Sequence, residues 1–500
     1  MQKRLKMKIM VKYLLISLLL FVTLSCEQWM ELIPPEGLTR EEFWKTKEDV
    51  EAVVMGAYET FSVMDGPLFK YGEIRADMVS GDIYQSDNER QVSEGNIYPE
   101  NWFCNWSQFY KVINYCNEVI KNAPIVREND NTFTEYLMRQ YISEATFLRG
   151  LAYFYLVRIF KDVPLVLVPT ETDDSELYIP KTDGDEILRF VIDDLKAARQ
   201  YVTSDGYKTL EEIRGRATKA AFDALLADIS LWLFDYEACI MYVENIENTK
   251  DLYDLLPSAK WFELYYPGNS LEGIFEFQFE TSRSQNNSMY GITTRYNYQY
   301  DPSEKALQYF AREFANESAP ELVRGEDASI KKWGDNDYVI WKYVGRAPDG
   351  KTTRTGTDQY SCNWIVYRYA DVLLMKAEAL SQIGQFLEAS ELLNQVRRRA
   401  GLPDLILSES ATAYEDAILE ERALELAFEG KRWFDLLRMG RRNDYARKSK
   451  LIEIVVENVP STQKRILATK LTNPLGWYLP IYKYELERNK NLVQNPYYNY

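Results

Sequence analysis

The sequence predicts a mostly helical protein. In the predicted fold, helix pairs resembling tetratricopeptide repeats form a scaffold that carries long inserted loops and a few short strands. Residues 368–401 place apolar side chains at helical spacing, turn at Gly384 and start a second helix at Phe386. Residues 217–246 follow the same order, with Tyr236 in the place of Phe386. A helix, a tight turn, an aromatic residue and a second helix with small residues are typical of such repeats.

The two helix pairs lie far apart in the sequence, so we expect them to be embedded in a larger globule and not stacked as a free solenoid. Helical spacing also predicts helices at 39–58, where Thr39 and Glu42 form a capping box, and at 106–122, 134–160 and 414–428. Alternation predicts strands at 273–281 and 337–344. The rest of 282–357 and the tail from 458 are predicted to be long ordered loops, which often carry function.

The N-terminus is typical of an export signal. Basic residues precede an apolar run from Tyr13 to Leu24. As a helix this run reaches about 18 Å, short of the roughly 30 Å hydrocarbon core. Leu24-Ser25-Cys26 resembles the bacterial lipoprotein signal, in which the cysteine is acylated and becomes the new N-terminus. We predict a signal peptide over 1–25 and lipidation of Cys26; the alternative is a plain secretory signal.

Composition narrows the function classes. The formal charge is −17, and no stripe of Lys and Arg suited to phosphate backbones is visible, so nucleic acid is not an expected partner. The chain has no histidine, which removes the commonest general base, the Ser-His-Asp and Cys-His arrangements and imidazole-ligated metals. No CxxC pair suggests a redox or metal site. We therefore expect no metal and no cofactor, and we expect Cys104, Cys116, Cys239 and Cys362 to be buried thiols, with one disulfide as the alternative.

Residues 345–352, GRAPDGKT, match the phosphate-binding loop pattern G-x-x-x-x-G-K-[ST]. That loop needs a helix directly after it, whose N-terminal amides hold the phosphates. The following residues, TRTGTDQYS, have no helical periodicity. We interpret Pro348-Asp349-Gly350 as a tight turn and not as part of a nucleotide site.

Two aromatic segments are candidate ligand sites, because flat rings with polar tips suit the recognition of sugars or peptides. The first has Trp102 and Trp106 at a loop-to-helix junction, with Asn105 between them. The alternative is a hydrophobic staple that caps the helix.

The second candidate is the tyrosine-rich stretch from 290 to 300, which is too polar for a core strand. Its candidate contacts are Tyr290, Arg295, Tyr296 and Tyr298, with Arg295 suited to hydroxyls or a carboxylate. The alternative is a tyrosine-rich loop that lies on helices.

Seven segments in this order carry a family resemblance, and they are 34–58, 72–79, 144–169, 215–240, 367–380, 419–438 and 479–496. Examples are EATFLRGLAYFYLVRIFKDVPLVLVP in the middle of the chain and LEERALELAFEGKRWFDLLR near its end. With the signal at Cys26, the chain resembles the SusD/RagB outer-membrane nutrient-binding lipoproteins. One departure is Lys161, which stands where the family usually has glycine.

The resemblance implies a SusD-like body over 26–500, with an N-terminal part at 26–270 and a C-terminal SusD/RagB part at 271–500. It also implies a lipid anchor in the outer membrane, an exterior-facing position, and a role as a lid on a SusC-like TonB-dependent transporter. In starch-binding members a Trp and an Asn three residues later contact the ligand. Trp102 and Asn105 match that pair best.

The leading hypothesis is glycan capture for import by a protein that is not an enzyme. Peptide capture by a RagB-like lid is the alternative on the same architecture. A glycoside hydrolase that uses only carboxylates is less favoured, since with 76 acidic residues any carboxylate spacing can be found. A purely structural helical scaffold is the third alternative.

Overall fold

The computed structural model describes eight stretches of the chain, and these are residues 43–170, 178–202, 207–249, 252–294, 298–314, 324–334, 337–347 and 352–499. Cys26, Thr39 and Glu42 lie outside them. Residues 46–500 form one compact unit. The division at residue 270 stays a prediction.

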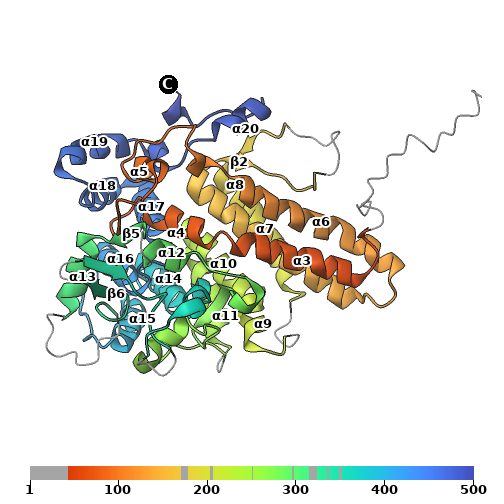
Figure 1. Ribbon diagram of the computed structural model, residues 1–500, viewed down its shortest axis with the longest axis horizontal. Helices are drawn as coiled ribbons and strands as arrows, with labels where there is room; N and C mark the ends of the chain where they lie inside the picture. The colour runs from red at the N-terminus through yellow and green to blue at the C-terminus, as the bar shows by residue number, and fades with distance from the viewer. Residues whose placement is uncertain are drawn as a thin grey trace, which may run out of the picture. The chain divides into compact units, whose positions relative to one another are not determined.

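Four helices from the first half of the chain form a group in which α7 contacts the other three. They are α3 (Lys47–Ser62), α6 (Ser107–Asn129), α7 (Glu135–Phe160) and α8 (Gly184–Arg199) (Figure 1). The α3 helix contacts α6 and α7, and α7 contacts α6 and α8. The predicted capping box of Thr39 and Glu42 lies outside the described residues. The described helix α3 begins later, at Lys47, and Thr46 and Asp49 form its capping box.

The two predicted helix pairs are confirmed. They are α10 (Lys219–Trp232) with α11 (Tyr236–Glu247), and α14 (Tyr369–Gln382) with α15 (Phe386–Arg399). Within each pair the helices contact each other, and α11 also contacts α14. The pairs are therefore neighbours in space, although more than a hundred residues separate them in the chain.

The C-terminal part adds helices that sequence patterns only partly predicted. The predicted helix at 414–428 is α16 (Ala411–Glu425), and it is followed by α17 (Arg432–Tyr445) and α18 (Lys448–Val456). The expected loops in the tail and in 282–357 also contain α19 (Ser461–Leu471) and α13 (Glu304–Phe314), so the prediction of loops throughout these regions was wrong. Few of the α19 side chains are buried, and these are Leu467 and Leu471, which explains why its periodicity was weak.

Shorter helices complete the described part of the chain. The α-helices are α4 (Asp65–Glu73), α5 (Asp87–Ser93), α9 (Leu210–Gly215), α12 (Met289–Thr293) and α20 (Lys483–Arg488). The 3-10 helices are η2 (Trp102–Cys104), η3 (Ser258–Leu264), η4 (Thr281–Arg283), η5 (Gly356–Tyr360), η6 (Pro474–Trp477) and η7 (Pro496–Tyr498).

The described strands form four antiparallel pairs. They are β1 (Val79–Gly81) with β5 (Tyr300–Pro302), β2 (Val163–Pro164) with β3 (Lys181–Thr182), β4 (Gly273–Phe277) with β8 (Trp364–Arg368), and β6 (Ile330–Trp333) with β7 (Asp337–Ile340). The strands predicted at 273–281 and 337–344 are present as the shorter β4 and β7. Residues 345–352 do not start a helix in their described part, since Arg346 and Thr353 pair across the loop.

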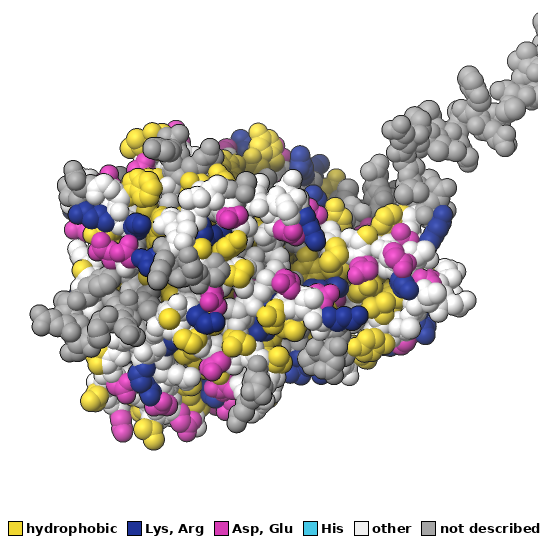
Figure 2. Space-filling model, turned by 60° about the horizontal axis from the view of Figure 1, so that its bottom comes forward, with side chains coloured by type: hydrophobic (Ala, Val, Ile, Leu, Met, Phe, Trp, Pro, Cys, Tyr) yellow, Lys and Arg dark blue, Asp and Glu magenta, His cyan; other side chains and the backbone are white. Residues whose placement is uncertain are grey.

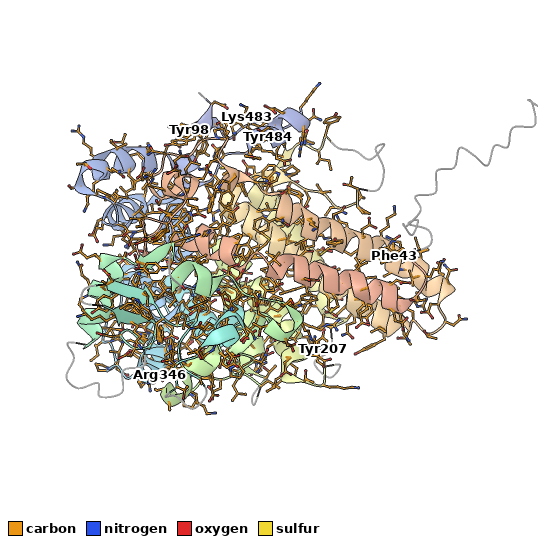
Figure 3. The ribbon with its side chains drawn as sticks, viewed as in Figure 1. Phe43, Tyr98, Tyr207, Arg346, Lys483 and Tyr484 are labelled. Carbon is orange, nitrogen blue, oxygen red and sulfur yellow. The ribbon has the colours of Figure 1, made fainter. Side chains whose placement is uncertain are left out.

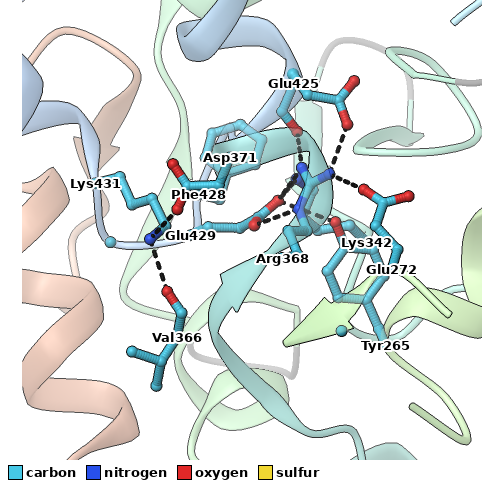
Figure 4. Close-up of polar contacts among 12 residues, drawn as sticks. Tyr265, Glu272, Lys342, Val366, Arg368, Asp371, Glu425, Phe428, Glu429 and Lys431 are labelled. Atoms are coloured by element: carbon cyan, nitrogen blue, oxygen red, sulfur yellow. Dashed lines mark hydrogen bonds and ion pairs between the residues drawn. The ribbon is translucent and has the colours of Figure 1, made fainter. Parts of the chain in front are cut away.

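A buried ion network joins β4, β8 and the end of α16 (Figure 4). The guanidinium group of Arg368 is fully buried and donates to the carboxylates of Glu272, Glu425 and Glu429 at 2.5, 2.7 and 2.9 Å. Lys342 adds a bond of 2.9 Å to Glu429. Burial opposes ionisation, yet the pKa of Glu425 and that of Glu429 are both lowered, because cationic neighbours surround them.

The cysteines follow the leading expectation. Cys104, Cys116, Cys239 and Cys362 are buried free thiols, and burial raises the pKa of Cys116 and Cys362 to about 12. Over the described residues, no helix combines the length and the apolar character needed to cross a membrane. On the face shown in Figure 2, acidic and basic side chains are interspersed with small groups of hydrophobic ones.

Candidate functional site

An aromatic pocket of about 460 Å³ is the candidate site. Its lining includes the rings of Tyr84, Tyr290, Tyr298, Trp333 and Trp341. Ligand pockets are commonly 300–1,000 Å³, lined by apolar and aromatic groups with a few polar ones. Lys331, Arg354 and Thr294 are among the polar residues of this lining.

The β6–β7 hairpin builds one wall. Lys331 is paired with Val339, and Trp333 is paired with Asp337. Because side chains alternate along a strand, Lys331 and Trp333 lie on the same face of the hairpin. The chain then continues into Trp341, whose amide donates to the carbonyl of Ser329 at 2.8 Å.

The β1–β5 pair positions two further rings by joining residues far apart in the sequence. Val79 is paired with Pro302, and just beyond the pair Asp82 N–H donates to the carbonyl of Gln299 at 2.9 Å. This pairing brings Tyr84, in the loop after β1, into the same pocket as Tyr298, which precedes β5. The α12 helix supplies Tyr290.

The five rings differ in exposure. Tyr84 is 52% exposed and Trp333 is 49% exposed, whereas Trp341 is 3% exposed. Tyr290 and Tyr298 are half-buried and pack against the cluster formed by Val339, Trp341 and Val344. The pocket therefore has a buried apolar floor and two accessible rings, Tyr84 and Trp333. Such rings can stack on a flat apolar ligand face while their polar tips remain in water.

Carboxyl groups beside Tyr298 give this side of the pocket an unusual electrostatic character. Burial raises the pKa of Tyr298 to about 12, and the charges of Asp301 and Asp82 add to the effect. Burial also raises the pKa of Asp301 to about 7, and the neighbouring charge of Asp82 contributes. Asp301 is therefore partly protonated near neutral pH and can donate as well as accept hydrogen bonds.

Arg354 connects two backbone segments at the pocket through hydrogen bonds. Its guanidinium group is buried and lies 3.8 Å from the centroid of the Tyr266 ring. It donates to the carbonyls of Tyr343 and Val344 at 3.0 and 3.4 Å and also to the carbonyl of Asp358. Burial lowers the pKa of Arg354. These bonds fix a cation at the pocket by means of neutral acceptors.

Comparison with known proteins decides the family. A sequence model described as "SusD family" matches residues 232–498. The chain belongs to the SusD family. A second model, described as "Starch-binding associating with outer membrane", matches residues 28–231.

Individual relatives of this SusD-family protein match nearly its whole length. A SusD-like protein of Formosa agariphila is 27% identical, over 97% of this chain and 98% of its own. Among solved structures, a SusD superfamily protein from Bacteroides vulgatus has a TM-score of 0.76 and 21% identity, covering 91% of this chain and 100% of that one. A structure described as a laminarin-binding SusD-like protein has a TM-score of 0.70 and 22% identity, with the same coverage. These structures show that the fold is shared.

The structure separates the two predicted aromatic sites of this SusD-family protein. Tyr290 and Tyr298 line the pocket, whereas Arg295 and Tyr296 lie outside the described residues. Tyr84, Lys331, Trp333, Trp341 and Arg354 were missed. For Trp341 the sequence offered one signal, the alternation of the strand predicted at 337–344. No local pattern connected that strand to the tyrosine-rich stretch from 290 to 300.

Trp102, Asn105 and Trp106 are not part of the pocket lining. Trp102 is 46% exposed on η2, and the Asn105 side chain accepts from Ser107 N–H at 2.8 Å at the start of α6. The prediction that Trp106 contacts a ligand at the surface is corrected by its burial. Trp106 is 3% exposed and its ring packs against Phe160 and Tyr110, so it is a core residue.

The surface near Trp102 is distinct from the pocket. Pro99 accepts a backbone hydrogen bond from Lys483 at 2.8 Å, and Figure 3 shows Tyr98 near Lys483 and Tyr484 at the top of the view. Arg346, two residues after the pocket residue Val344, lies at the lower left of the same view.

A second cavity of about 480 Å³ lies on the other side of the loop after β1, since Asp82, Ile83 and Gln85 line it. Among the described residues that line it, the single aromatic one is Tyr300, which is fully buried. This cavity therefore offers no accessible ring, and the aromatic pocket is the stronger candidate.

Proposed function

We propose that this SusD-family protein is a surface lipoprotein that binds an oligo- or polysaccharide in the aromatic pocket and delivers it to a SusC-like TonB-dependent transporter. The observation that carries the proposal is the convergence of five aromatic side chains from separate segments on one pocket. Sugar rings have apolar faces and hydroxyl edges, which match exposed aromatic rings with polar groups beside them.

The expected affinity is modest. Each aromatic contact contributes about 0.5–1.5 kcal/mol beyond the burial of its area. Two or three such contacts, less the cost of ordering the ligand, predict dissociation constants on the order of micromolar to millimolar. Weak binding suits a protein that passes its ligand on.

The relatives support the choice of glycan over peptide. One matching family model is described as starch-binding, and one structural neighbour is described as laminarin-binding. These descriptions concern those proteins, and we extend the ligand class to this chain because its pocket has the chemistry for it.

Calorimetry on the purified protein with a panel of polysaccharides tests the proposal. Trp333→Ala removes an exposed pocket ring, and we expect about tenfold weaker binding, equal to about 1.4 kcal/mol. Trp102→Ala is the matched control, because Trp102 is similarly exposed but lies outside the pocket. If Trp102→Ala loses binding and Trp333→Ala binds as wild type, the ligand site lies at the surface near Trp102 and Asn105 and not in the aromatic pocket.

The anchor and the partner need separate tests. Metabolic labelling with a palmitate analogue should modify the wild type and not Cys26→Ala. Purification of the lipidated protein from detergent-solubilised membranes should recover a large β-barrel partner. Recovery of the unlabelled wild type from the cytosol would contradict the proposed outer-membrane location.

The enzyme alternative makes an opposite prediction for Asp301, whose partly protonated carboxyl group beside Tyr298 is suited to donate a proton. A binding protein should leave its polysaccharide uncut. Release of reducing ends by the wild type, lost in Asp301→Asn, would favour the hydrolase. Binding of peptides in preference to every polysaccharide tested would favour the RagB-like alternative.

A further inference from the structure

Lys331 is a cation in the aromatic pocket. Its ammonium nitrogen lies 4.4 Å from the centroid of the Trp341 ring, and the hairpin register places it on the same face as Trp333. Within the described stretches, no ion pair or hydrogen bond involves its side chain nitrogen. An ammonium group has three donors, and a cation–π contact leaves them available.

Other lysines of the chain show the alternative to this arrangement, which is an ion pair. The chain carries 76 acidic and 59 basic residues, so a lysine has carboxylates in excess around it. Lys70, Lys305 and Lys376 each pair with a glutamate at 2.6, 2.5 and 2.6 Å. Lys331 instead lies over an indole ring at the wall of an open pocket.

Arg354 adds a second positive charge to the same lining. Among the described residues, its guanidinium group donates to backbone carbonyls and to the hydroxyl of Ser361, and the charge of Asp358 acts on it without a direct bond to that carboxylate. The lining therefore contains two cations, Lys331 and the buried Arg354.

The acidic groups lie toward Tyr298. Asp82 and Asp301 act on that tyrosine, and so does Asp337, which is paired with Trp333, two residues further along the hairpin than Lys331. Asp337 lies on the same face of the hairpin as Lys331, diagonally across from it, so an anion bound at Lys331 has to avoid this exposed carboxylate. An anionic group is therefore disfavoured beside Tyr298, where Asp82 and Asp301 act, and Lys331 is the cation of the lining that can receive it.

We propose that the pocket selects glycans that carry an anionic group, a uronate carboxylate or a sulfate ester, and that Lys331 binds that group. This inference rests on the proposed function and specifies its ligand class. The Trp333 ring packs against the apolar face of the sugar, and the Lys331 ammonium group donates to the anionic oxygens.

Calorimetry with chemically matched ligands tests the inference on the full-length protein in detergent. Pectin is compared with its carboxyl-reduced product, and carrageenan with its desulfated product, so that the members of each pair differ in charge. We expect at least one acidic polysaccharide to bind about tenfold more tightly than its neutral product, and to bind more weakly as salt is raised. The two pairs distinguish a carboxylate from a sulfate.

The variants are Lys331→Gln and the control Lys332→Gln. Lys332 is the next residue of β6, is exposed and lies on the opposite face of the hairpin. Lys331→Gln should lower affinity for the acidic ligand about five- to tenfold and leave the neutral product unaffected, whereas Lys332→Gln should behave as wild type.

The outcomes separate the two proposals. If neutral products bind as tightly as their acidic parents, or if both lysine variants lose affinity equally, the selection of anionic glycans is wrong and glycan binding stands. If no polysaccharide of either charge binds, the proposed function fails and the inference fails with it.

Discussion

Lys161 occupies a backbone conformation that glycine accepts most easily. It follows the last residue of α7 with φ 71° and ψ −78°. A side chain in this region costs on the order of 1–3 kcal/mol, because the Cβ atom crowds the backbone. The resemblance to the family had already marked this position as one where glycine is usual.

Lys161→Gly should therefore stabilise the protein, by about 1 kcal/mol after the larger unfolded-state entropy of glycine is subtracted. The shift in the urea unfolding midpoint measures the gain. Lys161→Ala is the control, since alanine keeps the Cβ atom and should give no such gain. Equal midpoints for wild type and Lys161→Gly would show that this turn is unstrained.

Glu73 is a buried residue whose surroundings oppose the charge of its carboxyl group. One carboxylate oxygen accepts from the amides of Gly430 and Lys431 at 2.8 and 3.2 Å, and the other has no hydrogen-bond partner among the described residues. Burial raises the pKa of Glu73 from 4.5 to about 8. The folded protein therefore holds a proton that the unfolded chain releases above about pH 4.5.

This carboxyl group should make stability fall as pH rises. Its contribution is complete below about pH 4.5 and is lost as pH rises through the folded pKa of about 8. Glu73→Gln keeps an acceptor oxygen and cannot ionise, so its free energy of unfolding relative to wild type should grow between pH 5 and pH 8 by about 2 kcal/mol or more. Denaturant unfolding at both pH values measures this, and a constant difference would contradict the raised pKa.

At the scale of elements, the end of α4 packs directly on the turn between α16 and α17. A Cβ atom added at Gly72 would lie 1.8 Å from the carbonyl oxygen of Gly430. Gly430 itself has φ 71°, which favours glycine. Two glycines thus allow an N-terminal helix and a C-terminal turn to touch through their backbones.

Gly72→Ala should destabilise the protein by about 2 kcal/mol or more. The backbone at Gly72 and the backbone at Gly430 cannot move apart without breaking the hydrogen bonds of Glu73 to Gly430 and Lys431. Gly56→Ala is the matched control in α3, where an added Cβ atom meets nothing within 4 Å. That change should stabilise the helix by about 0.5–1 kcal/mol. Thermal unfolding of both variants gives the comparison, and equal effects would contradict the close contact.

At the scale of the whole molecule, buried ion pairs hold together segments from the middle and the end of the chain. Arg368 on β8 contacts Glu272 next to β4 and both Glu425 and Glu429 around the end of α16. Arg399 at the end of α15 also bonds to Glu272 and Glu425. These bonds link the second helix pair to the sheet and to the C-terminal helices.

Arg368→Met should cost about 3–5 kcal/mol, because it leaves buried carboxylates without their main cation. Arg398→Met is the control, since Arg398 pairs with Glu391 on the exposed face of α15 and such pairs contribute about 0–1 kcal/mol. Chemical denaturation should separate the two variants clearly. A similar small loss in both would mean that water or neighbouring cations replace Arg368.

The helices were predictable because their signals are local. Thr134 caps the helix that the apolar spacing of 134–160 predicted, and Tyr236 and Phe386 begin the second helices of their pairs. The lipidation motif at Cys26 is also read from neighbouring residues, and its role stays a prediction. The α19 helix was missed because few of its side chains are buried, whereas α13 has a clear apolar face with Ala306, Tyr309 and Phe310 buried and was overlooked inside a region interpreted as a loop.

The candidate pocket depends on contacts that no local pattern contains. Tyr84 reaches Tyr298 because β1 pairs with β5 across more than two hundred residues, and Lys331 joins Trp333 through the alternation of a hairpin strand. Trp106 was predicted as a ligand contact and Trp333 was not, yet Trp106 is buried against Phe160 and Trp333 is half exposed in the pocket. Helix periodicity is a property of neighbouring residues, whereas exposure and convergence arise only when distant segments pack together.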